Sequence, residues 1–374
     1  IVRCVKPQAG EVIQDPAAGT AGFLIAADSY IKSETDDLFD LTEKEQNFQK
    51  NNAFVGIELV PGTRRLSLMN CLLHGIEGDS TDESEGVIHL GNALGDAGKS
   101  LKPADVILAN PPFGTSKGGE ASITRDDLTF ETSNKQLAFL QHIYRNLKPG
   151  GRAAVVLPDN VLFEAGKGTD IRRDLMNKCN LHTILRLPTG IFYAAGVKTN
   201  VLFFSKGTAK KPKQEENCTT HTWVYDLRTN MPSFGKRTPF GESHLKPFEK
   251  VFGKKADGTS KRTEEEWSYV EEGVEQTLES SRWRCFTREY IRDTKSDSLD
   301  ISWLKDKDSI DAADLPEPDV LAAEAMTELT EALRELDGLM AALGASDQAK
   351  VQKDLLADAL GLAFDEEQPE AGAK

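Results

Sequence analysis

The sequence predicts a doubly wound, Rossmann-like α/β sheet with a C-terminal helical tail. Three observations support this prediction. Short apolar segments alternate with helix-like segments through the first two hundred residues. Glycine, asparagine and proline follow the ends of these segments, as they do where strands stop. Apolar residues then recur at three- and four-residue steps between Glu317 and Leu343, which is typical of an amphipathic helix.

The predicted strands and helices follow one another in regular order. Strands are expected at residues 11–14, 53–58, 87–90, 104–109 and 152–157, with helices from residue 23, over 64–73 and over 137–147. Two further strands, 182–187 and 199–205, are separated by a short link that a broad hairpin would explain. Apolar strands that alternate with helices indicate a parallel sheet covered on both faces, here with one antiparallel strand at the end.

The rest of the chain divides into two parts. Residues 208–311 give weaker signals and predict an irregular extension with a few strands, of which 222–226 is the clearest. Residues 312–374 predict helices, one carrying the stripe Leu329, Leu333, Leu336, Met340 and Leu343 and a shorter one over 351–364. Periodicity alone favours packing of this stripe against the preceding domain. Because the chain begins at Ile1, we expect a fragment that lacks an N-terminal part.

Composition limits the classes of function. The 39% apolar content, without an apolar run near the roughly 20 residues that span a bilayer, predicts a soluble protein without membrane contact. Five scattered cysteines favour a reduced cytoplasmic location, and six histidines without ligand spacing predict no metal. The net charge of −15 predicts that any grip on nucleic acid is shared with a partner, because phosphate contacts require a basic face.

A glycine turn follows the first predicted strand. Gly19 and Gly22 allow a tight turn there and admit a ligand at the helix N-terminus. The turn is not a P-loop, since no Gly-Lys-Ser/Thr follows. Glu58 ends the second strand, where nucleotide-binding folds place an acid on the ribose hydroxyls, and Asn92 follows the third. A plain turn, a solvated loop acid and a turn asparagine remain the alternatives.

The stretch ILANPPFG, Ile107 to Gly114, ends the fourth predicted strand. The Asn110 side-chain oxygen and the Pro111 carbonyl provide two acceptors for a planar amino group, and proline brings no competing N–H donor. Phe113 is suited to stack on a base taken out of a duplex. A rigid strand-ending turn explains the prolines but not the asparagine and the aromatic residue that flank them.

Two of these stretches resemble motifs of S-adenosylmethionine-dependent amino-methyltransferases of DNA: DPAAGTAGF, Asp15 to Phe23, and NPPF, Asn110 to Phe113. Longer stretches are more specific. Glu58 to Gly75, Pro149 to Arg173 and Leu187 to Phe204 resemble the modification subunit of Type I restriction–modification systems, and Ser296 to Leu321 resembles the tail of its EcoKI-like branch. The resemblance covers essentially the whole chain.

The resemblance implies an adenine-specific methyltransferase that uses S-adenosylmethionine to methylate N6 of adenine in double-stranded DNA. It assigns the cofactor to Asp15, Ala17, Gly19, Thr20, Ala21, Gly22, Phe23, Glu58 and Asn92, with the ribose on Glu58. It assigns catalysis to Asn110, Pro111, Pro112 and Phe113, and packing of the flipped base to Phe113, Phe192 and Tyr193. Two positions depart from the family pattern: Ala21 stands where glycine is frequent and Asn92 where aspartate is frequent.

The same resemblance implies a division of labour within a complex. Residues 1–207 are expected to form the methyltransferase catalytic domain, and residues 312–374 an assembly segment. The expected partners are DNA, a specificity subunit, a second modification subunit and a motor-nuclease subunit, and the missing N-terminal part is expected to contain a helical domain. Cytosine N4, a protein glutamine, or loss of activity in a structural subunit are the alternatives, because NPPF suits any planar amino group.

Overall fold

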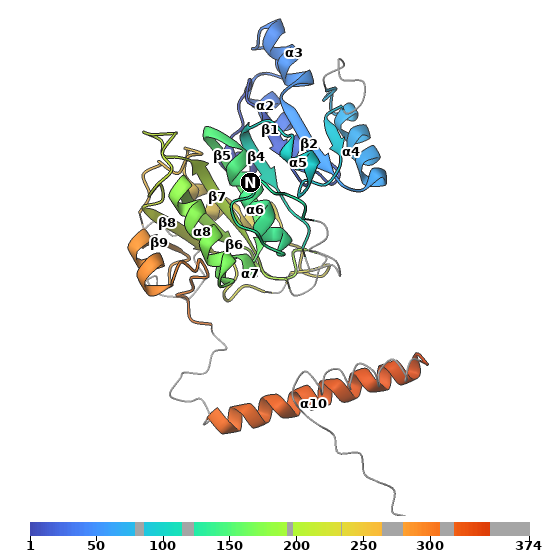
Figure 1. Ribbon diagram of the computed structural model, residues 1–374, viewed down its shortest axis with the longest axis vertical. Helices are drawn as coiled ribbons and strands as arrows, with labels where there is room; N and C mark the ends of the chain where they lie inside the picture. The colour runs from blue at the N-terminus through green and yellow to red at the C-terminus, as the bar shows by residue number, and fades with distance from the viewer. Residues whose placement is uncertain are drawn as a thin grey trace, which may run out of the picture. The chain divides into compact units, whose positions relative to one another are not determined.

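A mixed β-sheet organises the first part of the chain (Figure 1). The computed structural model describes residues 1–78, 86–113, 123–192, 197–232, 234–263, 280–306 and 318–344. The chain divides into two compact units, Ile1–Lys307 and Asp308–Lys374.

The sheet of the first unit has nine strands within these described residues. They are β1 Ile13–Asp15, β2 Phe54–Glu58, β3 Ile88–Leu90, β4 Ala104–Ala109, β5 Leu147–Pro158, β6 Cys179–Arg186, β7 Thr199–Lys206, β8 His221–Asp226 and β9 Trp283–Thr287. Their spatial order is β3-β2-β1-β4-β5-β7-β6-β8-β9. Strands β1 to β5 are parallel, while β7 and β9 run antiparallel to their neighbours. The order reverses between β1 and β4, at the switch point where doubly wound sheets bind ligands.

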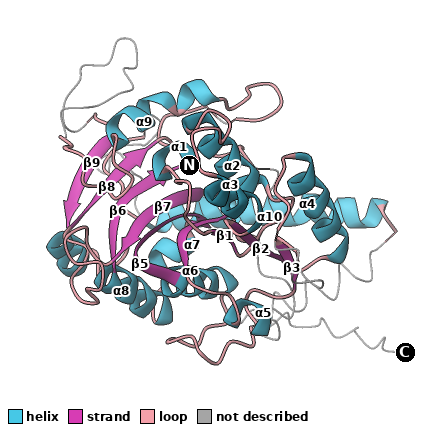
Figure 2. Cartoon of the chain, turned by 90° about the horizontal axis from the view of Figure 1, so that it is seen from above, coloured by secondary structure: helices cyan, strands magenta, loops and turns pink. Residues whose placement is uncertain are grey.

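Two layers of helices cover the sheet (Figure 2). One layer contains α1 Val2–Val5, α2 Gly22–Glu34 and α9 Lys246–Phe252, and the other contains α6 Lys135–Asn146, α7 Asn160–Phe163 and α8 Lys167–Lys178. The other helical segments of the unit are α3 Glu43–Asn51, α4 Pro61–Leu73, α5 Asp96–Lys99, η2 Glu242–His244 and η3 Tyr290–Thr294. Strand β5 alternates between the layers: Val156 packs with the first and Val155 with the second.

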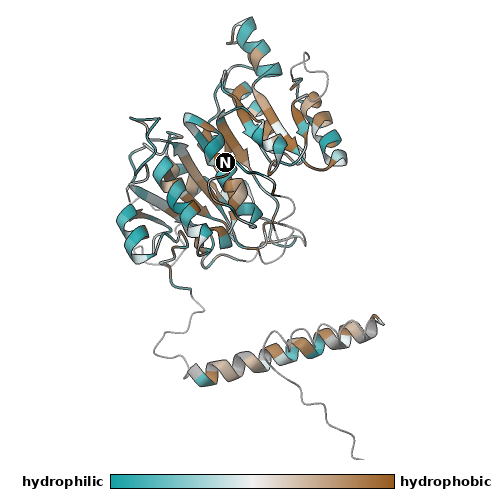
Figure 3. Ribbon diagram, viewed as in Figure 1, coloured by the Kyte–Doolittle hydropathy of each residue, from teal (hydrophilic) through white to brown (hydrophobic). Residues whose placement is uncertain are grey.

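The hydropathy of the chain accounts for this arrangement (Figure 3). Strand β4, with the sequence ADVILA, is almost wholly buried because both faces of the sheet are covered. Helix α6 buries Leu137, Leu140 and Tyr144, which recur at helical spacing. Its N-cap residue is Asn134, whose side chain accepts hydrogen bonds from the backbone N–H groups of Gln136 and Leu137. This cap fixes where α6 starts beside the end of β4.

The structure confirms the predicted fold class and extends the sheet beyond it. Each predicted strand is present, although β5 begins at Leu147, upstream of Gly150 and Gly151, where the sequence predicted a break between helix and strand. The prediction of one antiparallel strand at the end is incomplete, since the antiparallel β7 lies inside the sheet, which continues through β6 and β8 to a second antiparallel strand, β9. Strand β9 was not predicted because it is an edge strand, buried on Trp283 and Phe286 alone and lacking regular alternation.

The second unit contains α10, Pro318–Ala342, close to the helix predicted over 317–343. Its apolar side chains include Leu329, Leu336 and Leu343, which are 58%, 57% and 71% exposed. The second predicted helix, 351–364, lies outside the described residues.

The five cysteines are all free. No helix of the described ranges is long and apolar enough to cross a membrane.

Candidate active site

The carboxyl ends of three neighbouring strands bring the predicted motifs to one edge of the sheet. Strand β1 ends at Asp15 and pairs on one side with β2, which ends at Glu58, and on the other with β4, which ends just before Asn110. The glycine turn, the acid and NPPF therefore lie side by side at the switch point, although up to 95 residues separate them in the sequence.

The turn from Asp15 to Gly22 is held by hydrogen bonds within it and to β2. The Ala17 N–H donates to the Asp15 carboxylate at 3.0 Å, and the Ala18 N–H donates to the Ile57 carbonyl at 2.9 Å. Gly56 makes this contact with β2 feasible, because a Cβ there would lie 2.9 Å from the Ala18 methyl group. The strand and the turn thus approach more closely than two side chains would allow.

Three residues of the turn differ in backbone conformation. Gly19 and Ala21 have φ of 54° and 65°, in the left-handed region that favours glycine. Ala21 is fully buried, and its methyl group belongs to the core under α1 and α2. Gly22 opens α2 with no positive φ, and a Cβ at Gly19 or at Gly22 would meet no heavy atom within 4 Å. Both glycines therefore border open space.

A cavity of about 760 Å³ occupies that space. It is lined by eight of the residues predicted from the sequence: Asp15, Ala17, Gly19, Thr20, Gly22, Phe23, Asn110 and Phe192. Ala21, Glu58, Asn92 and the residues Pro111 to Phe113 are not among its lining residues. One cavity thus extends from the glycine turn to the first residue of NPPF.

No cofactor or catalytic role was predicted for the residues of the opposite wall of the cavity. Residues of α1, of β5, β6 and β7, of the loop after β6 and of the region around α9 form this wall. They are Ile1, Val2, Arg3, Cys4, Val156, Leu185, Leu187, Ile191, Val201, Phe203, Phe240, Leu245, Phe248 and Glu249. Arg3 spans it with an ion pair to Glu249 at 2.7 Å. Most of these residues are apolar and look like ordinary core residues in the sequence. Only the fold places them beside the glycine turn and Asn110.

Asp15 is the acidic group at the floor of the cavity. Asp15 is only 1% exposed, and this burial raises the pKa of its carboxyl group to about 7. The hydrogen bond from the Ala17 N–H lowers this pKa, whereas the negative charge of the nearby Glu58 raises it. A carboxyl in this position gains from a cationic ligand, which would favour its charged form.

Glu58 and Asn92 both make local hydrogen bonds. The Glu58 carboxylate accepts the Gly19 N–H at 3.0 Å and the Val60 N–H at 2.8 Å. The Asn92 side-chain oxygen accepts the Leu94 N–H at 2.9 Å, as in a turn asparagine. Each oxygen of Glu58 keeps a second lone pair, so these bonds leave it able to accept from a ligand.

The NPPF segment is held from α6. The Gln136 side chain donates to the Pro112 carbonyl at 2.8 Å, a contact that sequence reasoning missed because Gln136 lies 24 residues away. Asn110 is exposed at the end of β4, whereas Pro111 is buried. The rings of Phe113 and Phe192 meet edge to face, with centroids 5.5 Å apart. Tyr193 lies outside the described residues.

Comparison with known proteins places this geometry in a family. A family model described as N-6 DNA Methylase matches residues 1–280, and one described as Type I restriction enzyme methylase subunit, C-terminal domain, matches residues 315–358. The chain belongs to the N-6 DNA methylase family. The EcoKI methylase subunit of Escherichia coli K12 is 64% identical over 372 residues, covering 96% of this chain and 69% of its own length.

Solved structures agree with this assignment. The crystal structure of the EcoKI M protein (EC 2.1.1.72) superposes with a TM-score of 0.77 at 62% identity, covering 96% of this chain and 74% of that one. A chain from a structural study of complex assembly and conformational transition in the Type I restriction–modification system superposes with a TM-score of 0.61 at 26% identity. The match covers 92% of this chain and 64% of that one. The predicted family is confirmed, and with it the reaction class of an adenine-specific DNA methyltransferase of the Type I systems.

Proposed function

We propose that the cavity between the glycine turn and Asn110 is where this chain transfers a methyl group from S-adenosylmethionine to N6 of adenine in double-stranded DNA. The single observation that carries the proposal is that Asp15, Gly19, Gly22 and Asn110 line one continuous cavity. A cofactor turn and an amino-group acceptor are useful together only when one space connects them, because methyl transfer requires the two reactants to be in line.

The residues of the turn fit the cofactor. S-adenosylmethionine supplies an electrophilic methyl group on a positively charged sulfur. Asp15 would hold the ammonium or sulfonium charge, which its buried carboxyl requires in order to ionise, and the open space at Gly19 and Gly22 would receive the methionine part. Glu58, beside Gly19, would accept the ribose hydroxyls through its unused lone pairs. The adjoining wall of the cavity is formed by Ala17, Thr20 and Phe23. Ala21 supports the turn from the core, and Asn92 would lie near the adenine ring of the cofactor.

Asn110 would act on the target amino group. The lone pair of an adenine amino nitrogen is delocalised into the ring, which makes the nitrogen a poor nucleophile. The Asn110 side-chain oxygen and the Pro111 carbonyl would accept its two N–H groups and direct the lone pair at the methyl group. The hydrogen bond from Gln136 to the Pro112 carbonyl supports the segment that carries this acceptor pair. No general base with a strongly shifted pKa is required.

Aromatic side chains would hold the extruded base. Phe113 and Phe192 come from different strand ends and already contact each other at the edge of the cavity. We expect the adenine to stack on one of them, since unpaired bases gain about 1–3 kcal/mol from such stacking. Tyr193 remains a further candidate for packing the base.

The chain would work as one subunit of a complex. The proposed partners are a specificity subunit that reads the DNA sequence, a second modification subunit and a motor-nuclease subunit, in the cytoplasm. The net charge of −15 supports a shared grip on DNA. Residues 1–207 would carry the chemistry, 208–311 would complete the cavity wall through Phe240 and Phe248, and 312–374 would serve assembly.

A methyl-labelled cofactor tests this proposal. The complex assembled with its specificity subunit should transfer label to adenine N6 in duplex DNA, and digestion of the product to nucleosides would identify the acceptor. Label on cytosine or on protein would reveal a different acceptor at the same site. An absence of label in every fraction, although the cofactor binds, would show that the subunit is structural.

A further inference from the structure

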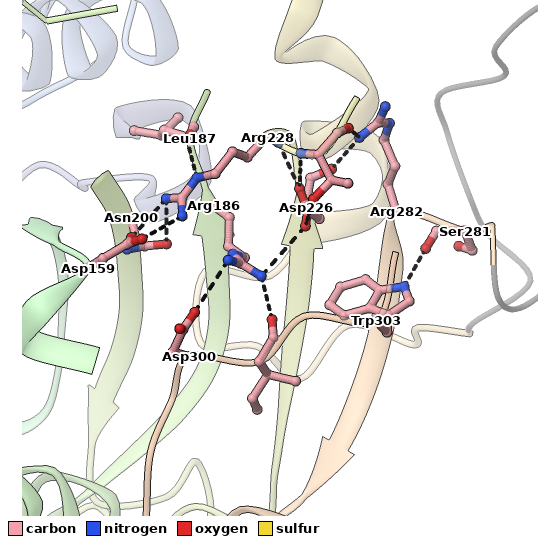
Figure 4. A network of polar contacts seen from close by, with 12 residues as sticks. Asp159, Arg186, Leu187, Asn200, Asp226, Arg228, Ser281, Arg282, Asp300 and Trp303 are labelled. Atoms are coloured by element: carbon pink, nitrogen blue, oxygen red, sulfur yellow. Dashed lines mark hydrogen bonds and ion pairs between the residues drawn. The ribbon is translucent and has the colours of Figure 1, made fainter. Parts of the chain in front are cut away.

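A shielded ion pair links several strand ends beside the cavity (Figure 4). Arg228 follows β8 and Asp159 follows β5. Two nitrogens of the Arg228 guanidinium donate to the two oxygens of Asp159, at 2.7 and 2.9 Å. Their side chains are only 10% and 19% exposed. The two-point geometry fixes the orientation of the guanidinium as well as its position.

The remaining donors of Arg228 reach the neighbouring strands. Its Nε donates to the Leu187 carbonyl at 3.0 Å, just past the end of β6, and an Nη donates to the Thr199 carbonyl at 2.9 Å, at the start of β7. Asn200 completes the group by donating to Asp159 at 2.7 Å. One side chain thus connects the ends of β5, β6 and β8 with the beginning of β7.

The backbone of Arg228 is itself held by a buried carboxylate. The Asp226 carboxylate accepts the backbone N–H groups of Arg228 and Thr229, each at 2.8 Å, and Asp226 is fully buried at the end of β8. An arginine anchored at its backbone in this way can define where the Leu187 carbonyl lies.

Leu187 begins the segment that carries Phe192, one of the aromatic residues predicted for the base site; we call this segment, residues 187–192, the base loop. Leu187, Ile191 and Phe192 line the cavity, and Phe192 contacts Phe113 of NPPF. A second hydrogen bond fixes the base loop near its middle, where the Phe234 N–H donates to the Thr189 carbonyl at 3.3 Å. The base loop is therefore fixed at its first residue by Arg228 and near its middle by residue 234.

We propose that Arg228, paired with Asp159, is a positioning residue for the target base: it sets the base loop and so the place of Phe192 opposite NPPF. Arg228 does not line the cavity itself and acts through the Leu187 carbonyl. This inference rests on the proposed function, because it assumes that Phe192 helps to receive an extruded adenine. It predicts a defect in base capture and turnover without a defect in cofactor binding.

The test replaces Arg228 by lysine, which keeps the charge but not the two-point geometry. Duplex DNA with 2-aminopurine at the target adenine reports extrusion as a rise in fluorescence, measured on the complex with the specificity subunit. The Arg228→Lys complex should bind the cofactor with nearly wild-type affinity, show a smaller fluorescence rise, and turn over about ten- to a hundredfold more slowly. Asp159→Asn should show the same defects in milder form, because it keeps one acceptor oxygen.

Arg152→Lys is the matched control. Arg152 lies in the same sheet on β5, is 13% exposed, and is bidentate to Glu11, but it contacts the Val5 and Lys6 carbonyls, which do not line the cavity. It should lower the unfolding temperature without changing the fluorescence signal. The positioning role is overturned if Arg228→Lys matches the wild type, if it loses cofactor affinity in parallel, or if Arg152→Lys has the same fluorescence defect. A wild-type complex that puts no methyl group on adenine overturns the proposed function instead.

Discussion

The Glu58 carboxylate accepts the backbone N–H of Gly19 at 3.0 Å, which ties the end of β2 to the turn that follows β1. Its other oxygen accepts the Val60 N–H, so the same side chain also orders the start of the loop into α4. Glu58 therefore supports the shape of the proposed cofactor turn before any ligand is bound. Glu58, which the sequence predicts as a ligand of the ribose hydroxyls, therefore also has a structural role.

Glu58→Gln tests this double task. The amide presents one donor group, which must face an N–H of either Gly19 or Val60, and a lost or opposed hydrogen bond of this kind costs about 1–3 kcal/mol. We expect a lower unfolding temperature already without cofactor, together with weaker cofactor binding by calorimetry. Glu34→Gln, on the exposed end of α2, is the control. Full stability with weakened binding would restrict Glu58 to ligand contact.

Gly22→Val should separate folding from cofactor binding. A Cβ at Gly22 meets no heavy atom within 4 Å outside its own helix and φ is not positive, so the folded chain has room for a side chain here. A β-branched side chain would instead occupy the space proposed for the cofactor. The variant should therefore fold normally and lose cofactor binding in equilibrium dialysis.

Gly62→Val provides a matched control for that experiment. Gly62 also lies in the first turn of an exposed helix, α4, with open space at its Cβ, but it does not line the cavity. It should keep full cofactor affinity. Unchanged affinity in Gly22→Val would show that the cofactor does not approach this turn.

The elevated pKa of Asp15, about 7, predicts a pH dependence with two parts. In the unliganded protein the folded state binds the proton more tightly than the unfolded state, whose carboxyl titrates near pH 4. The stabilising contribution of Asp15 is thus fully present below about pH 4 and is lost as pH rises through about 7. Asp15→Asn should remove this component, and the unliganded variant should be more stable than the wild type at pH 8.

Cofactor binding should depend on pH in the opposite sense. A cationic ligand requires the charged carboxylate, so wild-type affinity should fall by up to roughly tenfold per pH unit below the pKa of Asp15. Asp15→Asn should bind weakly at every pH, without this slope. Calorimetric titrations of both proteins between pH 6 and 8 check the prediction, and parallel slopes would assign the titration to the ligand.

Sequence reasoning predicted those parts of the candidate site that local chemistry specifies. The turn from Asp15 to Gly22 and the NPPF segment stand out in the sequence because their glycines, prolines and asparagine directly follow apolar runs, as at the end of a strand. The far wall could not be predicted. Phe203 and Phe248 are ordinary core side chains. They reach the cavity only because Phe203 of β7 and helix α9 contribute to the same core as α2. Arg228 and Asp159, 69 residues apart, become partners only in the folded sheet.

Asn110→Ala should abolish chemistry and spare binding. Asn110 lies at the end of β4 with an exposed side chain, so its removal leaves no cavity in the core. We expect unchanged stability, near-normal cofactor affinity and a loss of methyl transfer of about a hundredfold or more. Single-turnover measurements with saturating DNA separate this loss from weaker DNA binding. Near-normal turnover would remove Asn110 from the proposed acceptor pair.

The tail of the chain should serve assembly. Leu329 and Leu336 on α10, and Leu343 just after its end, are more than half exposed, and the first unit already has cores on both faces of its sheet. Burying four or five such side chains against a partner would contribute on the order of 5–10 kcal/mol before ordering costs. Deletion of the residues after Leu315 should leave folding and cofactor binding intact but prevent co-purification with the specificity subunit.

Point variants make the test of the tail sharper. Leu329→Glu combined with Leu336→Glu places charges on the apolar stripe, whereas Arg334→Glu changes charge on the other side of the same helix. Only the first should break the complex, and DNA methylation should disappear with it, because the acidic catalytic chain has little grip on DNA of its own. Co-purification of the stripe variant, or unfolding of the first unit after the deletion, would mean that α10 supports its own chain and not the assembly.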